Sequence, residues 1–354
     1  MGVIDDPVAV TGLNATDNPG PGVSVIRSLR HDPEFRGRIV GLAYDSLDPG
    51  IYAEDIVDDV FLIPYPSQGA EALWERLATI RDRTGIRVVI PTLDSELPSF
   101  IALEDRLRDV GVGTFACTKA QYDLRAKDRL AEMGRAAGIP VPATKVISDP
   151  QSLVSIQKEI PYPFYVKGLY YGAKLARSLD EAVAAFHRIV AEWGLPVIIQ
   201  QALSGDDLNV VAVGDGAGGL IGAVPMKKTY ITDKGKGWAG VAIRDPALLD
   251  MTRRFMEHSK WRGPCEVEVL KDHAGGYHLL EINPRFPAWT YLAAGAGMNL
   301  PMAVTRLAAG EAVAPMTRFE AGTMFVRIAL DQIATMSDLQ QIASTGELLR
   351  GEQS

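Results

Sequence analysis

Positive charge is in short supply in this chain. Its 36 Lys and Arg residues stand against 44 Asp and Glu residues, which leaves a formal net charge of −8 at pH 7. A protein that binds the phosphate backbone needs a basic face to attract it. We therefore expect no nucleic acid partner.

Cysteine and histidine are also scarce. The chain has two cysteines, Cys117 and Cys265, and five histidines. None of these residues follows the close spacing that zinc ligands show, and two cysteines cannot build a disulfide framework. The sequence predicts neither a zinc site nor a disulfide-stabilised fold.

Long apolar runs are missing as well. No run approaches the roughly 20 apolar residues that a membrane-spanning helix needs. Residues 1–7 are acidic and lack the basic and apolar regions of a signal peptide. We expect a cytoplasmic protein without a membrane partner, and 47% hydrophobic content is enough for a large core in more than one domain.

Roughly the first 115 residues alternate two kinds of apolar pattern. Short apolar runs at 8–13, 38–44 and 87–91 predict buried strands, and helical spacing at 23–29 and 70–83 predicts helices. This alternation indicates a parallel, doubly wound sheet, in which ligands bind beyond the carboxyl ends of the strands. The loops at 14–22 and 91–96 would lie there. Asp94 and Glu96 in the second loop, with the segment 285–289 and Asn299, are candidates to line an amino-acid pocket.

The rest of the chain is richer in strands. A charged helical stretch at 118–138 precedes predicted strands at 164–167, 196–201, 208–213, 220–224, 265–270 and 277–282. Turn signals at 215–216 and 275–276 make two of the connections hairpins. This pattern indicates an antiparallel α+β domain, followed by a tail with one strand at 323–330 and a polar helix.

The strongest chemical signal is a set of oxygen donors on two of these strands. Glu268 lies on the strand at 265–270, and Glu281 and Asn283 lie on or just beyond the strand at 277–282. Residues two apart in a strand share a face, so the three side chains would converge. Carboxylate and amide oxygens suit Mg²⁺, and Arg285 on the same face would grip a phosphoryl group. The alternative is an exposed polar face of an antiparallel strand.

Three further signals are weaker when taken singly. Lys167 ends an apolar strand and is followed by glycine, which suits a phosphate contact, although strand-end lysines are commonly just solvated. Residues 200–203 follow a buried strand, and their backbone groups suit an adenine edge, with Asp207 near the ribose; the alternative is a plain turn. Lys228 lies in a basic, glycine-rich segment at 227–240, which is either a lid loop or a solvated loop.

The order and spacing of these pieces resemble the ATP-grasp superfamily. The pieces are Lys127, the segments 140–144, 165–167 and 200–207, then Glu268 and the sequence Glu281-Ile282-Asn283-Pro284-Arg285. Within the superfamily the chain resembles the branch of the carbamoyl-phosphate synthase large subunit, with its biotin carboxylase and D-alanine ligase relatives. The resemblance extends over residues 8–310, and its most specific element is the sequence 281–285.

The resemblance implies a division of the chain. An α/β parallel-sheet domain, the pre-ATP-grasp domain, would occupy residues 1–117, and an α+β ATP-grasp domain of two subdomains would follow. Its small subdomain would lie at 118–205 and its central and C-terminal subdomain at 206–311. A strand and helix at 312–354 would complete the last domain.

The resemblance also implies roles for particular residues and a reaction. By this resemblance the phosphates of ATP would contact Lys127 and Lys167, the ribose would contact Asp207, and the adenine would contact Gln200, Gln201, Ala202 and Leu203. The metal, Mg²⁺ with Mn²⁺ as an alternative, would be bound by Glu268, Glu281 and Asn283. Arg285 would contact the reacting phosphoryl group, and Lys228 would close over it. The expected function is an ATP-dependent carboxylate–amine ligase that forms an amide or peptide bond through an acyl phosphate. Its partners would be a small carboxylate and an amine, such as an amino acid or a peptide. Homodimer formation is left open.

Two departures from the family pattern keep other functions open. The loop after Lys167 has only Gly168 and Gly172 before Ser178, fewer than the family usually has, and Asp207 stands where glutamate is usual. The alternatives are an ATP-grasp kinase that phosphorylates a hydroxyl and a nucleotide-binding protein without turnover. A nicotinamide dehydrogenase is not favoured, because residues 12–22 do not spell Gly-x-Gly-x-x-Gly.

The metal assignment makes a direct prediction. The substitution Glu281→Gln removes one anionic oxygen ligand, so we expect it to abolish ATP turnover and to leave the fold intact. Phosphate release and circular dichroism measure the two effects. Full retained turnover would contradict the assignment.

Overall fold

The chain forms two compact units in a computed structural model that describes residues 2–16, 19–168, 172–231 and 237–350, without the side chains of Lys127 and Asp128. The first unit comprises residues 1–122, 209–267 and 283–354, and the second comprises residues 123–208 and 268–282. Strands β9 (Gly205–Asp215), β12 (Arg262–Asp272) and β13 (Tyr277–Asn283) supply residues to both units. The domain boundaries expected from the sequence stay predictions.

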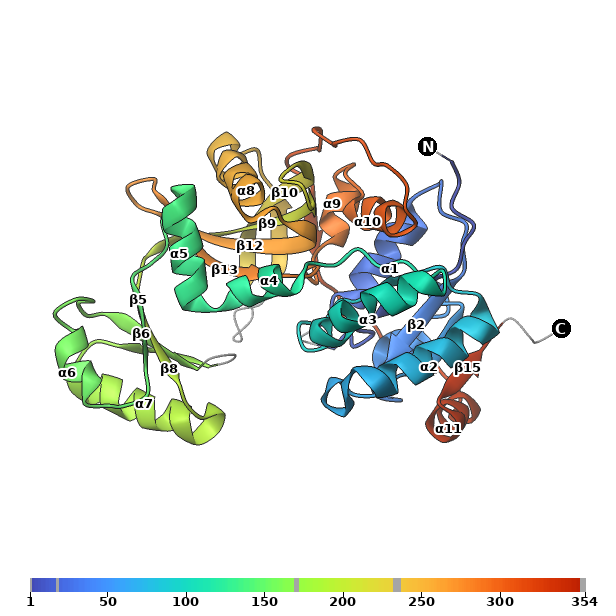
Figure 1. Cartoon of the computed structure of the whole chain (residues 1–354), viewed down its shortest axis with the longest axis horizontal. Helices are drawn as coiled ribbons and strands as arrows, with labels where there is room; N and C mark the ends of the chain where they lie inside the picture. The colour runs from blue at the N-terminus through green and yellow to red at the C-terminus, as the bar shows by residue number, and fades with distance from the viewer. Residues whose placement is uncertain (1, 17–18, 169–171, 232–236, 351–354) are drawn as a thin grey trace. The chain divides into compact units, whose positions relative to one another are not determined.

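A parallel sheet organises the N-terminal part of the first unit (Figure 1). Its order is β15-β3-β2-β1-β4, and β1 to β4 run parallel. The bounds are β1 Val8–Thr11, β2 Ile39–Ala43, β3 Asp59–Leu62, β4 Val88–Ile90 and β15 Glu347–Leu349. The strands of a parallel sheet are covered on both faces, which explains why β1, β2 and β4 read as nearly continuous apolar runs. The parallel sheet predicted from the sequence is therefore present.

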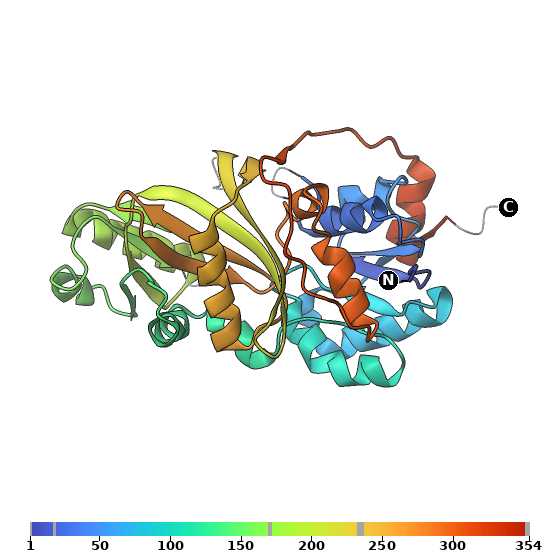
Figure 2. The same ribbon diagram turned by 90° about the horizontal axis from the view of Figure 1, so that it is seen from above.

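Helices cover the two faces of this sheet. Val8 and Val10 of β1 pack in one apolar cluster with Val25 and Ile26 of α1 (Gly22–His31), whereas Ala9 packs in the opposite cluster. That opposite cluster includes residues of α2 (Gly69–Thr84) and α3 (Leu97–Asp109). Figure 2 shows α1 in dark blue and the cyan helices α2 and α3 on opposite sides of the strands.

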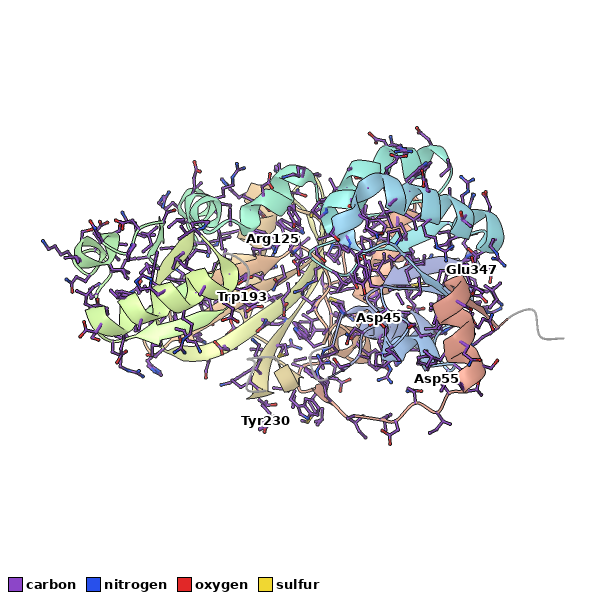
Figure 3. All side chains as sticks on the ribbon, turned by 90° about the horizontal axis from the view of Figure 1, so that it is seen from below. Asp45, Asp55, Arg125, Trp193, Tyr230 and Glu347 are labelled. Atoms are coloured by element: carbon purple, nitrogen blue, oxygen red, sulfur yellow. The ribbon has the colours of Figure 1, made fainter. Side chains whose placement is uncertain are left out.

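The end of the chain returns to this sheet. After α11 (Met336–Thr345), the last strand β15 pairs antiparallel with β3, with Leu348 opposite Val60. Glu347 (Figure 3) accepts hydrogen bonds from Arg76 at 3.2 Å and from Arg83, both on α2. The sequence pattern did not reveal β3 or β15, whose place in the sheet is set by pairing with distant strands.

The second unit contains a four-stranded antiparallel sheet of order β5-β8-β6-β7. Its strands are β5 Thr144–Ile147, β6 Phe164–Gly168, β7 Ala173–Ala176 and β8 Val197–Gln201. Helices α6 (Ser152–Ile156) and α7 (Leu179–Trp193) cover one face and complete an apolar core that includes Phe164 and Phe186 (Figure 1). The unit also includes α5 (Lys127–Ala137), preceded by a short 3₁₀ turn at Asp123–Arg125.

A six-stranded sheet of order β13-β12-β9-β10-β11-β14 completes the β structure. Besides β9, β12 and β13, it contains β10 Leu220–Ile231, β11 Gly237–Ala242 and β14 Met324–Val326. Around it lie α4 Lys119–Tyr122, α8 Pro246–Ser259, α9 Tyr291–Gly295 and α10 Leu300–Ala308. The prediction of a loop at 227–240 is wrong for the described residues of that segment. They belong to β10 and β11, which pair antiparallel, with Lys228 opposite Gly240.

A buried carboxylate anchors the loop that follows β4. Glu96 accepts hydrogen bonds from the backbone amides of Thr92 (2.7 Å) and Leu93 (2.8 Å) and from the hydroxyls of Thr11 and Tyr44. Burial raises the pKa of this carboxyl above its ordinary value, against the lowering effect of its donors. At the same place Gly12 has φ +72°, and a Cβ on it would stand 2.3 Å from Thr92 Oγ1. The ends of β1 and β4 are therefore locked together.

We expect Glu96→Ala to lower the free energy of unfolding by about 2–4 kcal/mol, because four buried or partly buried donors lose their acceptor. Glu71→Ala is the matched control, since Glu71 pairs with Arg106 at the surface and its loss should change stability little. Urea unfolding of the three proteins measures the difference. Equal stability of the two variants would contradict the anchoring role.

Within the ranges that the structure describes, no helix has both the length and the apolar content needed to cross a bilayer.

Candidate functional site

One carboxylate collects the polar side chains at the centre of the first unit. Glu266 on β12 accepts four hydrogen bonds, two on each oxygen. Its Oε1 receives Asn209 Nδ2 of β9 and Trp289 Nε1, both at 2.7 Å. Its Oε2 receives Asn283 Nδ2 at 3.1 Å and Arg285 Nη1 at 3.2 Å. We call Glu266 and these four partners the Glu266 cluster.

Arg285 is held from two sides. Its Nε donates to Asp94 Oδ2 at 3.0 Å, and its Nη1 donates to Glu266 Oε2 and to the carbonyl of Phe286 at 3.3 Å. The side chain is 13% exposed. A guanidinium that bridges two carboxylates has one fixed position, so Arg285 can present charge to a ligand without reorganisation.

The predicted metal ligands stand on adjacent strands. Glu268 lies on β12 and Glu281 on β13, and the two strands are joined by a turn at 272–276 in which the Asp272 side chain accepts from the amides of Ala274 and Gly276. Asn283 ends β13, two residues after Glu281 and therefore on its face of the strand. Glu268 and Glu281 are half-buried, and Asn283 is buried. Two carboxylates and an amide oxygen are the donor set that the sequence predicts for Mg²⁺, and this role stays a prediction.

The described residues contain no other candidate cluster of metal ligands. Throughout the described parts of the chain, no three or more His, Cys, Asp or Glu side chains gather closely enough to hold a metal ion. Both cysteines are buried, and burial raises the pKa of the Cys265 thiol well above its ordinary value. Thiolate chemistry is therefore not supported at this position.

In the second unit, Lys167 is fixed at the end of β6. Its Nζ donates to Gln200 Oε1 at 2.7 Å, and Gln200 Nε2 donates to Thr144 Oγ1 at 3.3 Å. These three residues lie on adjacent strands, β6, β8 and β5. The structure thus brings together two residues that the sequence assigned to ATP, Lys167 and Gln200. The Gln200 side chain is buried and serves to orient the lysine.

The expected adenine segment follows directly. Gln201 ends β8, its amide donates to the Ala143 carbonyl at 2.8 Å, and the amide of Ala202 donates to the Pro163 carbonyl at 3.3 Å. Leu203 is half-buried in the short link before β9. Asp207 lies within β9, with its side chain exposed, rather than in a turn. These roles toward a nucleotide stay predictions.

Some predicted features fall where the structure says little. Lys127 begins α5, but its side chain lies outside the described residues. Residues 169–171 of the short loop after Lys167 and residues 232–236 of the expected lid lie outside them too. What is described of the first loop is a hairpin, in which the Gly168 amide donates to the Gly172 carbonyl at 3.1 Å. Ser178 caps α7 by accepting from the Glu181 amide.

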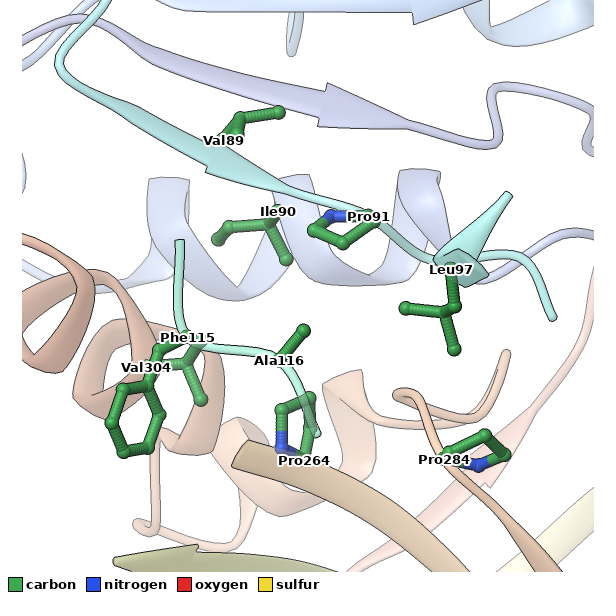
Figure 4. Close-up of a pocket in the computed structure, with 9 residues that line it drawn as sticks. All are labelled: Val89, Ile90, Pro91, Leu97, Phe115, Ala116, Pro264, Pro284 and Val304. Carbon is green, nitrogen blue, oxygen red and sulfur yellow. The ribbon is translucent and has the colours of Figure 1, made fainter. Parts of the chain in front are cut away.

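Two hollows were found in the described structure. One is an apolar cavity of about 10 Å³ beneath the loop after β4, and Figure 4 shows side chains such as Leu97, Pro264 and Pro284 around it. It has room for about one water molecule and none for a substrate. The other, of about 530 Å³, lies in the second unit between α5 and β5, where the Lys145–Glu159 ion pair (2.8 Å) forms part of its wall. Among the residues whose side chains are described, none of the predicted ATP contacts lines it.

Known proteins resemble this chain in sequence. Residues 195–329 match the family described as "ATP-grasp in the biosynthetic pathway with Ter operon". The chain is 23% identical over 223 residues to a phosphoribosylamine–glycine ligase of Synechocystis, an alignment that covers 56% of this chain and 53% of that enzyme. It is 24% identical over 199 residues to a D-alanine–D-alanine ligase of Chromohalobacter salexigens, which covers 51% and 63%. The chain thus spans about half the length of the curated relatives it matches.

Solved structures show the same fold. The biotin carboxylase domain of 2-oxoglutarate carboxylase from Hydrogenobacter thermophilus, in complex with MgADP, ADP and bicarbonate, superposes with a TM-score of 0.69 at 18% identity, over 89% of this chain and 72% of that one. The ADP complex of N5-carboxyaminoimidazole ribonucleotide synthetase gives 0.66 at 12% identity, over 91% and 82%. These similarities confirm the fold class predicted from the sequence, an α/β parallel-sheet domain followed by an α+β domain of the ATP-grasp type.

The sequence did not reveal the role of Glu266 or Asn209. Two signals were available: Glu266 alternates with Glu268 and so shares its face, and Asn209 interrupts an otherwise apolar run in β9. Trp289, from the segment expected to line an amino-acid pocket, is buried in the core of the first unit, where its Nε1 donates to Glu266.

The Lys167 contact makes a testable prediction. We expect Lys167→Met to weaken ATP binding about 10- to 100-fold, because one charge-assisted contact to a phosphate is lost. Lys145→Met is the matched control, since Lys145 lies in the same sheet and pairs with Glu159 at the surface. Isothermal titration calorimetry with ATP measures both. An equal loss in the control would contradict the assignment.

Proposed function

We propose that this chain is an ATP-dependent carboxylate–amine ligase that forms an amide or peptide bond through an acyl phosphate. The observation that carries the proposal is the arrangement at the end of β13. There the sequence 281–285 places Asn283 and Arg285 around Glu266, and Asp94 holds the other side of Arg285. The proposal is supported by the sequence relatives, which are named as ligases, and by a structural neighbour that is a biotin carboxylase domain.

ATP and Mg²⁺ are the cofactors that the residues fit. Glu268, Glu281 and Asn283 would supply the metal's oxygen ligands, and the ion would neutralise charge on the phosphates. Lys167, held by Gln200, would contact the phosphates, and Lys127 is proposed beside it. The segment 200–203 would bind the adenine, and Asp207 the ribose. Two solved structures of the same fold contain ADP, one of them with magnesium, which supports the assignment.

The proposed reaction has two steps. An oxygen of the substrate carboxylate attacks the γ-phosphorus of ATP, the bond to the β–γ bridging oxygen breaks, and ADP leaves. The amine nitrogen of the second substrate then attacks the acyl carbon, phosphate departs, and the nitrogen loses a proton to form the amide. Arg285, fixed by Asp94 and Glu266, offsets the negative charge that gathers on the phosphoryl group in both steps. Lys228 on β10 is proposed to assist it.

The names of the relatives support a small carboxylate and an amine as the substrates. Two of them are named for joining such compounds, glycine in one case and D-alanine in the other. The Glu266 cluster favours turnover over simple nucleotide binding. It holds Arg285, the last residue of the sequence 281–285, in a fixed position, which suits a residue that offsets charge on a transferring phosphoryl group. An amino acid or a peptide is the substrate class that we propose to test first.

The test is a phosphate-release screen with ATP and Mg²⁺ across pairs of amino acids and small carboxylates. A ligase releases phosphate only when two particular compounds are present, and mass spectrometry then detects the amide. The Arg285→Lys variant is expected to lose this activity at least 100-fold, since lysine cannot bridge Asp94 and Glu266. A phosphorylated product without phosphate release would identify a kinase instead. Binding of MgADP without turnover for any pair would contradict the ligase proposal.

A further inference from the structure

We infer that Glu266 is a positioning residue that sets which atom of the Asn283 amide is available to the metal ion and where Arg285 stands. The inference rests on the proposed function, because it concerns the metal that Asn283 is proposed to bind. It goes further by giving a role to a residue that no motif identifies. Its basis is the set of four hydrogen bonds that converge on one buried carboxylate.

The two carboxylate oxygens of Glu266 accept hydrogen bonds from different pairs of residues. Oε1 is anchored by Trp289 Nε1 and Asn209 Nδ2, and an indole N–H can only donate, so this position must be an acceptor. Oε2 receives Asn283 and Arg285, the two residues at the end of β13. Glu266 is 6% exposed, so water cannot readily replace either set of contacts. The buried Trp289 side therefore fixes the orientation of the whole carboxylate.

This orientation decides which way the amide of Asn283 is turned. A carboxylate accepts and does not donate, so the amide must direct its NH₂ group toward Glu266. The oxygen is then on the opposite side of the planar amide. Mg²⁺ binds amide oxygen and not amide nitrogen. Glu266 thus selects the only one of two amide orientations in which Asn283 is a metal ligand.

The same oxygen positions Arg285. Asp94 holds Nε and Glu266 holds Nη1, so the guanidinium is clamped from two sides. Asp94 is carried by the loop that Glu96 anchors, and its backbone carbonyl also accepts from the Tyr122 hydroxyl at 3.2 Å. One carboxylate on β12 therefore couples the orientation of a metal ligand to the position of the arginine.

The substitution Glu266→Gln separates this role from simple packing. The glutamine side chain has nearly the same size, and Trp289 and Asn209 require its oxygen at the Oε1 position. Its NH₂ group must then replace Oε2 and face Asn283. The Asn283 amide has to turn its oxygen toward this new donor, which directs its NH₂ group to the metal position.

A second substitution should reverse the defect. Asn283→Asp in the Glu266→Gln background supplies an oxygen on both sides of the planar group, one to accept from the glutamine and one for the metal. In the wild-type background the same change sets a carboxylate against Glu266, so it should weaken the metal site although it adds a charged oxygen. Ligand chemistry alone predicts the opposite for that single variant.

The experiment is titration of ADP in the presence and absence of Mg²⁺, followed by calorimetry, with Mn²⁺ binding followed by electron paramagnetic resonance. We expect Glu266→Gln to reduce the metal-dependent gain in ADP affinity, which is the ratio of the affinities with and without the metal, about 10- to 100-fold. The double variant should recover most of the gain, and Asn283→Asp alone should not. Glu104→Gln is the matched control, because Glu104 accepts from Arg262 of the same strand away from the cluster.

The outcomes are distinct. A Glu266→Gln variant with a wild-type metal response, a double variant no better than Glu266→Gln, or an Asn283→Asp variant that binds metal as well as the wild type would each overturn the inference. Circular dichroism verifies that the variants are folded, and the Asn283→Asp result decides the matter even if Glu266→Gln is unfolded. A wild-type chain without metal-dependent ADP binding would overturn the proposed function and this inference together.

Discussion

The convergence of four donors on the buried carboxylate of Glu266 is the constraint on which the candidate site depends. Two of the donors, from Asn209 and Trp289, have no proposed contact with a ligand and fix the carboxylate in place. The other two, from Asn283 and Arg285, belong to the proposed chemistry. A buried carboxylate is costly unless its hydrogen bonds are satisfied, and here both oxygens are. The fixed carboxylate can therefore orient Asn283 and Arg285, the two residues that belong to the proposed chemistry.

A second carboxylate extends this constraint to the parallel sheet. Glu96 holds the amides of Thr92 and Leu93 and ties the end of β4 to Thr11 at the end of β1. The loop it anchors carries Asp94 to Arg285 Nε. The ends of β1 and β4 are where a doubly wound sheet commonly binds a ligand. In this chain the position is occupied by Glu96, and the loop serves to place Asp94.

Much of the fold could be predicted from periodicity and turn residues. The apolar runs at 8–13, 38–44 and 87–91 correspond to β1, β2 and β4, and the pattern at 70–83 corresponds to α2. The strands β3 and β15 were missed, since their place in the sheet is set by pairing with segments distant in the chain. The glycine-rich segment at 227–240 was taken for a loop, because glycine and lysine are typical of loops, yet pairing with a neighbouring strand determined its described parts.

The sequence by itself determined the fold class, and it drew attention to the residues from which the candidate site is predicted. Glu268, Glu281, Asn283 and Arg285 stand out because they alternate along predicted strands, and alternation is a local property that the chain carries in its order. Only the tertiary structure decided that Glu266 orients Asn283 and Arg285, that Gln200 holds Lys167, and that Asp94 reaches Arg285. Those contacts join segments far apart in the chain, and the spacing along a sequence contains no information on which distant donor meets a buried acceptor.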